Sequence, residues 1–291
     1  MADFVFSASS VLPTDTALSE EPYRQFLCND AAEVTVCGHY GMPGISLREE
    51  ERVFDSGAAW EAYRVEGKPV FALRAAVSDR QPYCVAVFSP DFRSGDVFYR
   101  VPYPGSEPGS LLMNPLTFPL FHLLMTSLLA QGYGVLIHAC GIDDGGRGYL
   151  FTGSSTHGKT TMARIWKDEA LVLNDERIVV RQREGRLWIF GTPWHGEYEG
   201  VSPKGALLEK VFFLGRGDIN TVRPQHGAAA ASKLLTHCFL PFWDEKGMRF
   251  VLDFCAGLVQ EVPCGELGFV PDSGIIEFVR SEAVGTYRIP S

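Results

Sequence analysis

The chain has 291 residues, of which 46% are hydrophobic and 12% aromatic, enough apolar side chains for a large buried core. Its formal net charge is −9 and it contains no cluster of Lys and Arg, which argues against binding to nucleic acid. The longest apolar run, residues 116–134, is interrupted by polar residues and a proline, so it predicts a core helix and no membrane span.

The seven cysteines include no C-x-x-C spacing, which is typical of free thiols in a reduced compartment and not of a disulfide scaffold or a zinc ribbon. The N-terminal residues lack a basic segment followed by an apolar one, so no secretion signal is expected. Together these features predict a cytoplasmic protein.

Residues 1–110 form a β-rich N-terminal region of unknown role. Short runs rich in Val, Phe and Tyr, broken by turn residues, predict strands at 33–40, 70–77, 83–89 and 96–103. Residues 102–110 have the Pro, Gly and Ser content of a linker or exposed loop. We therefore expect a boundary between 105 and 115, with a second domain over 111–291.

The second domain alternates predicted helices and strands. Helices are expected at 116–131, 159–169, 226–238 and 244–260. Strands are expected at 134–142, 149–153, 170–182, 186–194 and 210–215. The segment 274–282 fits either a helix or a strand.

The segment "FTGSSTHGKTT" contains the phosphate-binding pattern G-x-x-x-x-G-K-[ST], between a predicted strand and a predicted helix. Glycines let the backbone approach phosphate groups, and amides at a helix start point toward them. Lys159 would reach the β- and γ-phosphates, and the Thr160 hydroxyl would bind Mg²⁺. The alternative is a Gly- and Ser-rich turn in which the lysine has no role in phosphate binding. The expected nucleotide-binding residues are Gly153, Ser154, Ser155, Thr156, His157, Gly158, Lys159, Thr160 and Thr161.

Two adjacent acids, Asp175 and Glu176, end the predicted strand in "VLNDERI". Neighbouring carboxylates repel each other unless a cation lies between them. One could hold Mg²⁺ while the other accepts a proton from an attacking hydroxyl. The alternative is that both acids cap or solvate a turn.

The succession of "LIHACGI", "GYLFTGSSTHGKTT", "VLNDERI" and "GTPWHGE" resembles the HPr kinase/phosphorylase family and its related serine kinases. The resemblance implies an α/β fold with a mixed sheet, a P-loop core like that of phosphoenolpyruvate carboxykinase. It implies that Asp175 is the general base, that His138 tunes the acid, and that Lys159 assists catalysis. Glu176, which replaces the family's second aspartate, would bind the metal with Thr160.

Three further residues are candidates for the site. Related kinases carry a run similar to "GTPWHGE", so His195 and Glu197 could face the phosphates or the metal. Arg216 could stabilise charge. Alternatively, the run forms only a turn, and Trp194 is a core residue without a role in the site. Arg216 would then be a solvated arginine in a turn.

The resemblance implies a cytoplasmic kinase that uses ATP, or another nucleoside triphosphate, with Mg²⁺. It would transfer the γ-phosphate to a hydroxyl, serine being expected, on a peptide, protein or small molecule. HPr itself is not the expected acceptor, because the family's C-terminal signature is missing. Family members often form homo-oligomers. Two alternatives stay open: a non-catalytic nucleotide-binding regulatory module, and phosphorolytic dephosphorylation at the same site.

Overall fold

The computed structural model describes residues 1–10, 21–57, 59–75, 81–100, 116, 118–154 and 157–284. The chain forms two compact units. One comprises Asp3–Gln131 and Pro241–Gly247, and the other Met1–Ala2, Gly132–Leu240 and Met248–Ser291. The linker expected at 102–110 lies outside the described residues, and the domain division at residue 110 stays a prediction.

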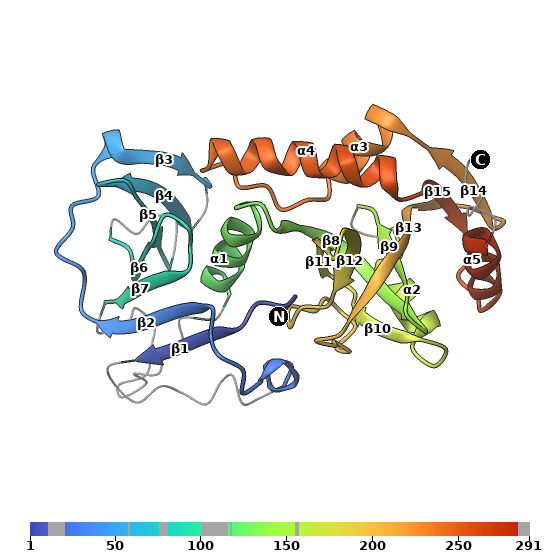
Figure 1. Cartoon of the computed structure of the whole chain (residues 1–291), viewed down its shortest axis with the longest axis horizontal. Helices are drawn as coiled ribbons and strands as arrows, with labels where there is room; N and C mark the ends of the chain where they lie inside the picture. Colours follow the sequence, from blue (N-terminus) through green and yellow to red (C-terminus); the bar gives the residue numbers. More distant parts are fainter. Residues whose placement is uncertain are drawn as a thin grey trace. The chain divides into compact units, whose positions relative to one another are not determined.

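The N-terminal unit contains a seven-stranded sheet in the order β1-β2-β7-β6-β5-β4-β3 (Figure 1). Strands β1, β2 and β7 run parallel to one another, and the remaining neighbours are antiparallel. The strands are β1 (Phe6–Ser10), β2 (Val34–Tyr40), β3 (Arg52–Asp55), β4 (Trp60–Val65), β5 (Lys68–Leu73), β6 (Cys84–Phe88) and β7 (Ser94–Tyr99). Two short 3₁₀ helices, η2 (Tyr23–Phe26) and η3 (Glu49–Glu51), lie between them.

Helix α1 (Leu120–Leu129) belongs to the N-terminal unit, and all of its residues except His122 are buried. The Phe121 ring packs edge-on against Phe6 of β1, with 5.1 Å between the ring centroids. Trp243, from the segment Pro241–Gly247, donates its indole N–H to Ser127 Oγ at 3.1 Å and packs against Phe71. The helix expected at 116–131 is confirmed over Leu120–Leu129, and its polar Ser127 has a buried partner.

The C-terminal unit contains the remaining strands and helices. The strands are β8 (Gly134–Asp144), β9 (Arg147–Thr152), β10 (Leu171–Asn174), β11 (Arg177–Arg183), β12 (Arg186–Phe190), β13 (Gly205–Arg216), β14 (Thr221–Gln225) and β15 (Cys264–Phe269). The helices are α2 (Lys159–Trp166), α3 (Gly227–Leu235), α5 (Gly274–Val284) and, from Met248 onward, α4 (Glu245–Glu261), which begins in the N-terminal unit. The ambiguous last segment is thus a helix.

The C-terminal sheet is mixed. Strand β8 pairs antiparallel with β9, β10 and β11, whereas β13 pairs parallel with β9 and β15. The pairings β8–β11, β11–β12, β12–β13, β13–β9 and β9–β8 form a closed circuit. The expectation of an α/β protein with a mixed sheet is confirmed.

An aromatic core joins the helices to this sheet. Trp166 of α2 and Tyr149 of β9 are fully buried, and Phe151 stacks on Phe212 of β13 with centroids 5.2 Å apart.

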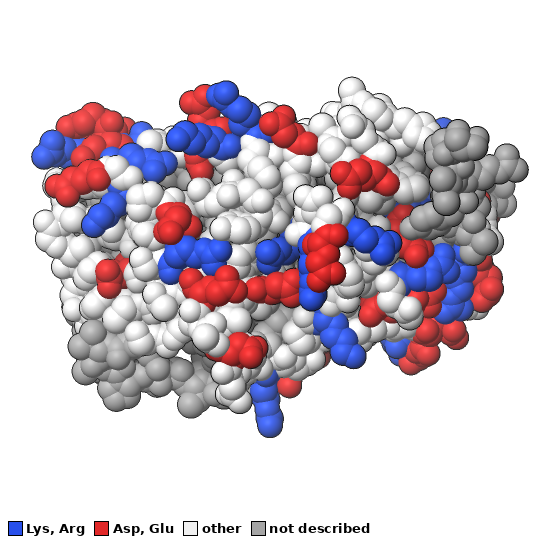
Figure 2. Space-filling model, viewed as in Figure 1, with Lys and Arg blue, Asp and Glu red and all other residues white. Residues whose placement is uncertain are grey.

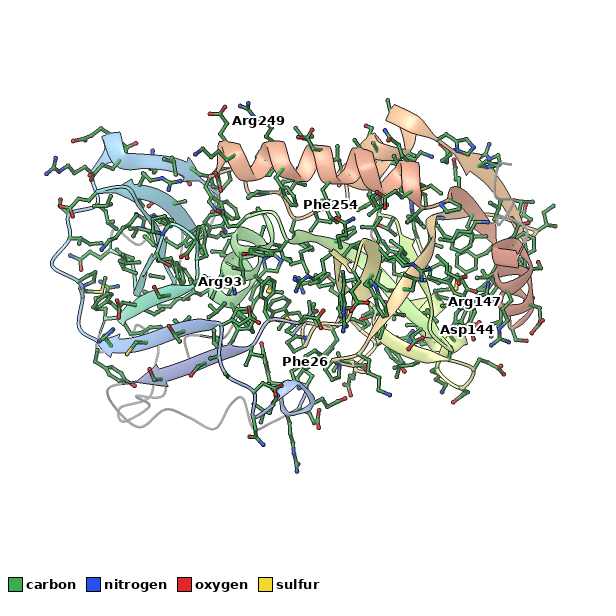
Figure 3. All side chains as sticks on the ribbon, in the orientation of Figure 1. Phe26, Arg93, Asp144, Arg147, Arg249 and Phe254 are labelled. Carbon is green, nitrogen blue, oxygen red and sulfur yellow. The ribbon has the colours of Figure 1, made fainter. Side chains whose placement is uncertain are left out.

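Arg280 of α5 makes two hydrogen bonds, of 2.9 and 3.0 Å, to the carboxylate of Asp144. Figure 3 labels Asp144 beside its register partner Arg147, at the turn of the β8–β9 hairpin. The turn of the hairpin that leads into the predicted phosphate loop is therefore anchored to α5.

The surface is mixed in charge on the face drawn in Figure 2, where Lys and Arg alternate with Asp and Glu. None of the helices in the described ranges combines the length and apolar character needed to cross a membrane. All seven cysteines are free thiols.

Candidate functional site

The predicted phosphate loop connects the end of β9 at Thr152 to the start of α2 at Lys159. Gly158 caps the helix with φ +96°, a left-handed conformation that favours glycine. A Cβ atom at this position would lie 2.7 Å from Cζ of Phe269. Glycine is thus required both by the backbone conformation and by the space available. Ser155 and Thr156 of the loop lie outside the described residues.

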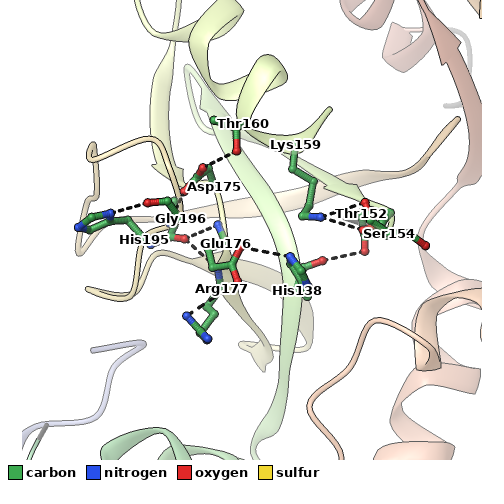
Figure 4. A network of polar contacts seen from close by, with 12 residues as sticks. His138, Thr152, Ser154, Lys159, Thr160, Asp175, Glu176, Arg177, His195 and Gly196 are labelled. Carbon is green, nitrogen blue, oxygen red and sulfur yellow. Dashed lines mark hydrogen bonds and ion pairs between the residues drawn. The ribbon is translucent and has the colours of Figure 1, made fainter. Parts of the chain in front are cut away.

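The Lys159 ammonium turns back onto the loop. Its Nζ donates hydrogen bonds to the carbonyl oxygens of Gly153, at 2.8 Å, and Ser154, at 3.4 Å (Figure 4). The residue is only 7% exposed, and burial lowers the pKa of its ammonium, while the nearby Glu176 carboxylate opposes that shift. The loop therefore holds a cation beside the amides at the start of α2.

Asp175 is buried and satisfied by three donors. Its carboxylate accepts hydrogen bonds from Thr160 Oγ1 at 2.9 Å, from the Gly196 amide at 2.7 Å and from the Tyr198 amide at 3.1 Å. The residue is 1% exposed. The Thr160 contact joins the first turn of α2 to the end of β10, which places this acid beside the helix start (Figure 4).

Glu176 is in a different environment, although it is the next residue. Its Oε2 lies 3.2 Å from His138 Nε2, and the two side chains are 27% and 28% exposed. The hydrogen bond with His138 lowers the pKa of the Glu176 carboxyl. His138 comes from β8, where it pairs in register with Arg177 of β11. Strand pairing therefore brings the predicted histidine to the second acid of the pair.

Asn174 and Thr192 fix the turn that carries the two acids. Asn174 Oδ1 accepts hydrogen bonds from the amides of Glu176, at 2.6 Å, and Arg177, at 2.8 Å, and its Nδ2 donates to the Thr192 carbonyl at 2.8 Å. Thr192 Oγ1 donates to the Arg177 carbonyl at 2.8 Å. Both residues are fully buried. Neither residue was expected from the sequence, where their only signal is their position beside the acids and in "GTPWHGE".

The rest of the "GTPWHGE" run has mixed roles. Trp194 is 5% exposed and belongs to the core. His195 Nδ1 contacts the Gly196 carbonyl at 2.9 Å, and Glu197 lies 3.7 Å from Arg164 of α2 with 81% of its side chain exposed. A Cβ on Gly196 would come within 3.1 Å of the Asp175 carboxylate. This glycine therefore permits the close backbone approach that satisfies the buried acid.

A cavity of about 470 Å³ lies over these residues. It is lined by His138, Gly158, Lys159, Thr160, Thr161, Arg164, Glu176, His195, Gly196 and Glu197. Asp175 is not among the lining residues. Arg216 is exposed at the end of β13 and does not line this cavity either, so its role stays a prediction.

His237 is a further histidine near the loop that the sequence did not single out. Its carbonyl accepts a hydrogen bond from the His138 amide at 2.8 Å. Burial, together with the nearby Lys159 ammonium and the neighbouring His138 and His157, lowers the pKa of His237 to about 4. His237 is therefore uncharged at neutral pH, near the Lys159 ammonium.

Comparisons with known proteins add little. No family model matches the chain, and no curated protein matches its sequence. Among solved structures, the chain is similar to the HPr(Ser) kinase/phosphatase from Coxiella burnetii, with a TM-score of 0.33 and 13% identity, over 51% of this chain and 96% of that one. A TM-score this low does not establish a shared fold.

Proposed function

We propose that the chain is a Mg²⁺-dependent phosphotransferase that moves the γ-phosphate of ATP, or of another nucleoside triphosphate, to a hydroxyl group. The expected acceptor is a serine of a peptide or protein, or a small molecule. The observation that supports this most directly is the 2.9 Å contact between Thr160, at the start of α2, and Asp175, at the end of β10. It supports the proposal because it connects the predicted phosphate loop to the acid pair, of which Glu176 lines the cavity.

The loop has the chemistry needed for a nucleotide. The amides at the start of α2, with the positive end of the helix dipole, would face the phosphates, and Lys159 would exchange its two carbonyl contacts for phosphate oxygens. The oxygen donors of Thr160 and Asp175 suit Mg²⁺, a hard cation. When bound, Mg²⁺ would neutralise charge on the β- and γ-phosphates. We propose for the C-terminal unit a P-loop core of the kind found in the HPr kinases, which its sequence motifs resemble.

The two acids differ in what they are free to do. Asp175 is buried and already accepts three hydrogen bonds, so it is suited to fix Thr160 and a metal ion. Glu176 lines the cavity and has one histidine partner. We therefore exchange the roles implied by the family resemblance: Glu176 would accept the proton of the acceptor hydroxyl, and Asp175 would serve the metal.

His138 would act through Glu176. Its Nε2 contact orients the carboxylate toward the cavity and stabilises the ionised form, which is the form able to accept a proton. The same pair would serve phosphorolysis, in which inorganic phosphate attacks the phosphorylated hydroxyl group, pyrophosphate forms and Glu176 passes a proton from the attacking phosphate to the departing hydroxyl oxygen. Both reactions would therefore depend on the same residues.

Glu176→Gln and Asp175→Asn form a matched pair for the test. Purified protein would be incubated with ATP, Mg²⁺ and a pool of serine-containing peptides, and products would be sought by mass spectrometry as a gain of one HPO₃ group. Binding of Mg²⁺-ATP would be measured by calorimetry. We expect Glu176→Gln to bind normally and to lose about 10²- to 10⁴-fold in transfer, the usual contribution of a general base. Asp175→Asn should weaken Mg²⁺-dependent binding.

Three outcomes would count against this proposal. Absence of Mg²⁺-ATP binding by the wild-type protein would remove the kinase assignment. Binding without transfer to any acceptor would favour the regulatory module. Full transfer by Glu176→Gln, with loss of transfer but not of binding in Asp175→Asn, would return the base to Asp175.

A further inference from the structure

A second group of chemically reactive side chains lies on the sheet of the N-terminal unit. Cys37 and His39 come from β2, and Asp96 comes from β7. The thiol sulfur, an imidazole nitrogen and a carboxylate oxygen of these residues all lie within 4.8 Å of one another. None of the three belongs to the nucleotide site.

Strand register explains why they meet. Strands β2 and β7 are parallel neighbours in which Cys37 is the register partner of Asp96. His39 lies two residues beyond Cys37 and so projects from the same face of the sheet. Val34 and Val36 alternate with them and are buried on the opposite face. The pairing of β2 with β7 therefore brings together three residues from segments that are far apart in the sequence.

The imidazole is held in place from two sides. Its Nε2 lies 2.7 Å from Asp96 Oδ1, and its ring stacks on Phe98 with centroids 4.8 Å apart. The His39 and Asp96 side chains are 30% and 57% exposed. An ion pair this exposed contributes only about 0–1 kcal/mol to stability. The arrangement is thus poorly explained by stability alone.

A cavity of about 460 Å³ adjoins the cluster, and Cys37 and Asp96 are among its lining residues. Three ligands with an open fourth position are typical of zinc sites that bind water or a further ligand. Here the open position would face the cavity.

We propose that Cys37, His39 and Asp96 bind a divalent transition-metal ion of the zinc class. Thiolate and imidazole are ligands that Zn²⁺ prefers, whereas Mg²⁺ prefers oxygen, so this site would select a different ion from the one at the phosphate loop. Zn²⁺ binds sulfur at about 2.3 Å and nitrogen or oxygen at about 2.0–2.2 Å, so donors within 4.8 Å need only small side-chain shifts to converge on one ion. The Cys37 thiol would lose its proton on binding.

Cobalt provides a direct test, because a thiolate bound to Co²⁺ gives a charge-transfer absorption in the near ultraviolet. The full-length protein would be reduced, stripped with a chelator and titrated with Co²⁺. We expect the band to saturate at one equivalent and to disappear when Zn²⁺ is added. Cys37→Ser should abolish the band, and His39→Ala should weaken Co²⁺ binding at least about tenfold, the lower end of the losses seen even for outer-shell partners.

Cys28→Ser is the matched control, because Cys28 is an exposed free thiol in the same unit. It should keep the band and its affinity. Circular dichroism would verify that each variant is folded. The proposal is overturned if the wild-type protein shows no such band, if Cys37→Ser retains it, or if Cys28→Ser loses it. The result is independent of the proposed kinase activity, since no residue is shared.

Discussion

Asp175 and Glu176 are adjacent in sequence yet have different surroundings. The first is enclosed by a hydroxyl and two amides, and the second reaches the cavity beside His138. Both residues lie in the bend between β10 and β11, where Asp175 is buried under its three donors and only Glu176 lines the cavity. This difference in surroundings is the reason for proposing different roles for the two carboxylates.

His237 gives the protein a specific sensitivity to acid. Its pKa is about 4 in the folded protein, below the ordinary value of 6.5, so the folded state binds fewer protons than the unfolded state between these values. The resulting stability is present above pH 6.5 and is lost as the pH falls toward 4. We expect His237→Gln to reduce the loss of unfolding free energy between pH 7.5 and about 5, as measured by urea denaturation.

The exposed His226 provides the comparison for this measurement. His226→Gln should leave the pH dependence as it is in the wild-type protein. Equal acid sensitivity in all three proteins would show that the imidazole of His237 does not control it.

At the scale of the elements, Asn174 and Thr192 connect two segments that are separate in sequence: the turn that carries Asp175 and Glu176, and the run that follows β12. Asn174 ends β10, and Thr192 follows β12. Their hydrogen bonds connect the turn between β10 and β11 to the "GTPWHGE" run, which in turn presents the Gly196 amide to Asp175. The run therefore acts mainly by positioning the acids.

Thr192→Val tests this connection, since it replaces the hydroxyl by a methyl group and leaves the Arg177 carbonyl without that donor. We expect a loss of about 1–3 kcal/mol in the free energy of unfolding, as for other buried groups left unsatisfied. Transfer activity should fall more than nucleotide binding. Thr192→Ser, which keeps the hydroxyl, should retain most of both; equal losses in the two variants would contradict the role of the hydrogen bond.

At the scale of the whole molecule, a ligand that binds only the folded state adds to its stability. Mg²⁺-ATP at 100 times its Kd should add about 2.7 kcal/mol to the free energy of unfolding of the wild-type protein. Calorimetric scans with and without nucleotide would measure the effect. We expect Gly158→Ala to lose most of it, because a Cβ there would collide with Phe269.

Gly145→Ala is the control that distinguishes the effect of the collision with Phe269 from the effect of backbone strain. Gly145 also has a left-handed φ, +66°, but nothing lies within 4 Å of its added Cβ. It should lose some intrinsic stability, about 1–2 kcal/mol for a left-handed residue, and keep the full nucleotide effect. If both variants respond to Mg²⁺-ATP like the wild-type protein, the shape of the loop is not critical for binding.

Much of the C-terminal fold could be predicted from the sequence. The hairpin before the loop, the helix after it and the strand ending in the acids were all expected close to their observed positions. Several strands were missed. Strand β14 contains Pro224 and mostly exposed side chains, and β15 contains two glycines, so neither has the composition of a strand. Their formation depends on tertiary pairing: β15 pairs with β13, and β14 pairs with β15.

The sequence by itself determined the features that depend on consecutive residues: the glycines and lysine of the loop, the helix that follows, and two acids at the end of a strand. Only the tertiary structure decided which acid faces the cavity, that His138 contacts Glu176, and that Cys37 meets Asp96. The physical reason is that backbone conformation is set by local sterics and hydrogen bonding, whereas these contacts depend on strand register between distant segments. A shift of one residue in that register would turn each side chain to the other face of its sheet.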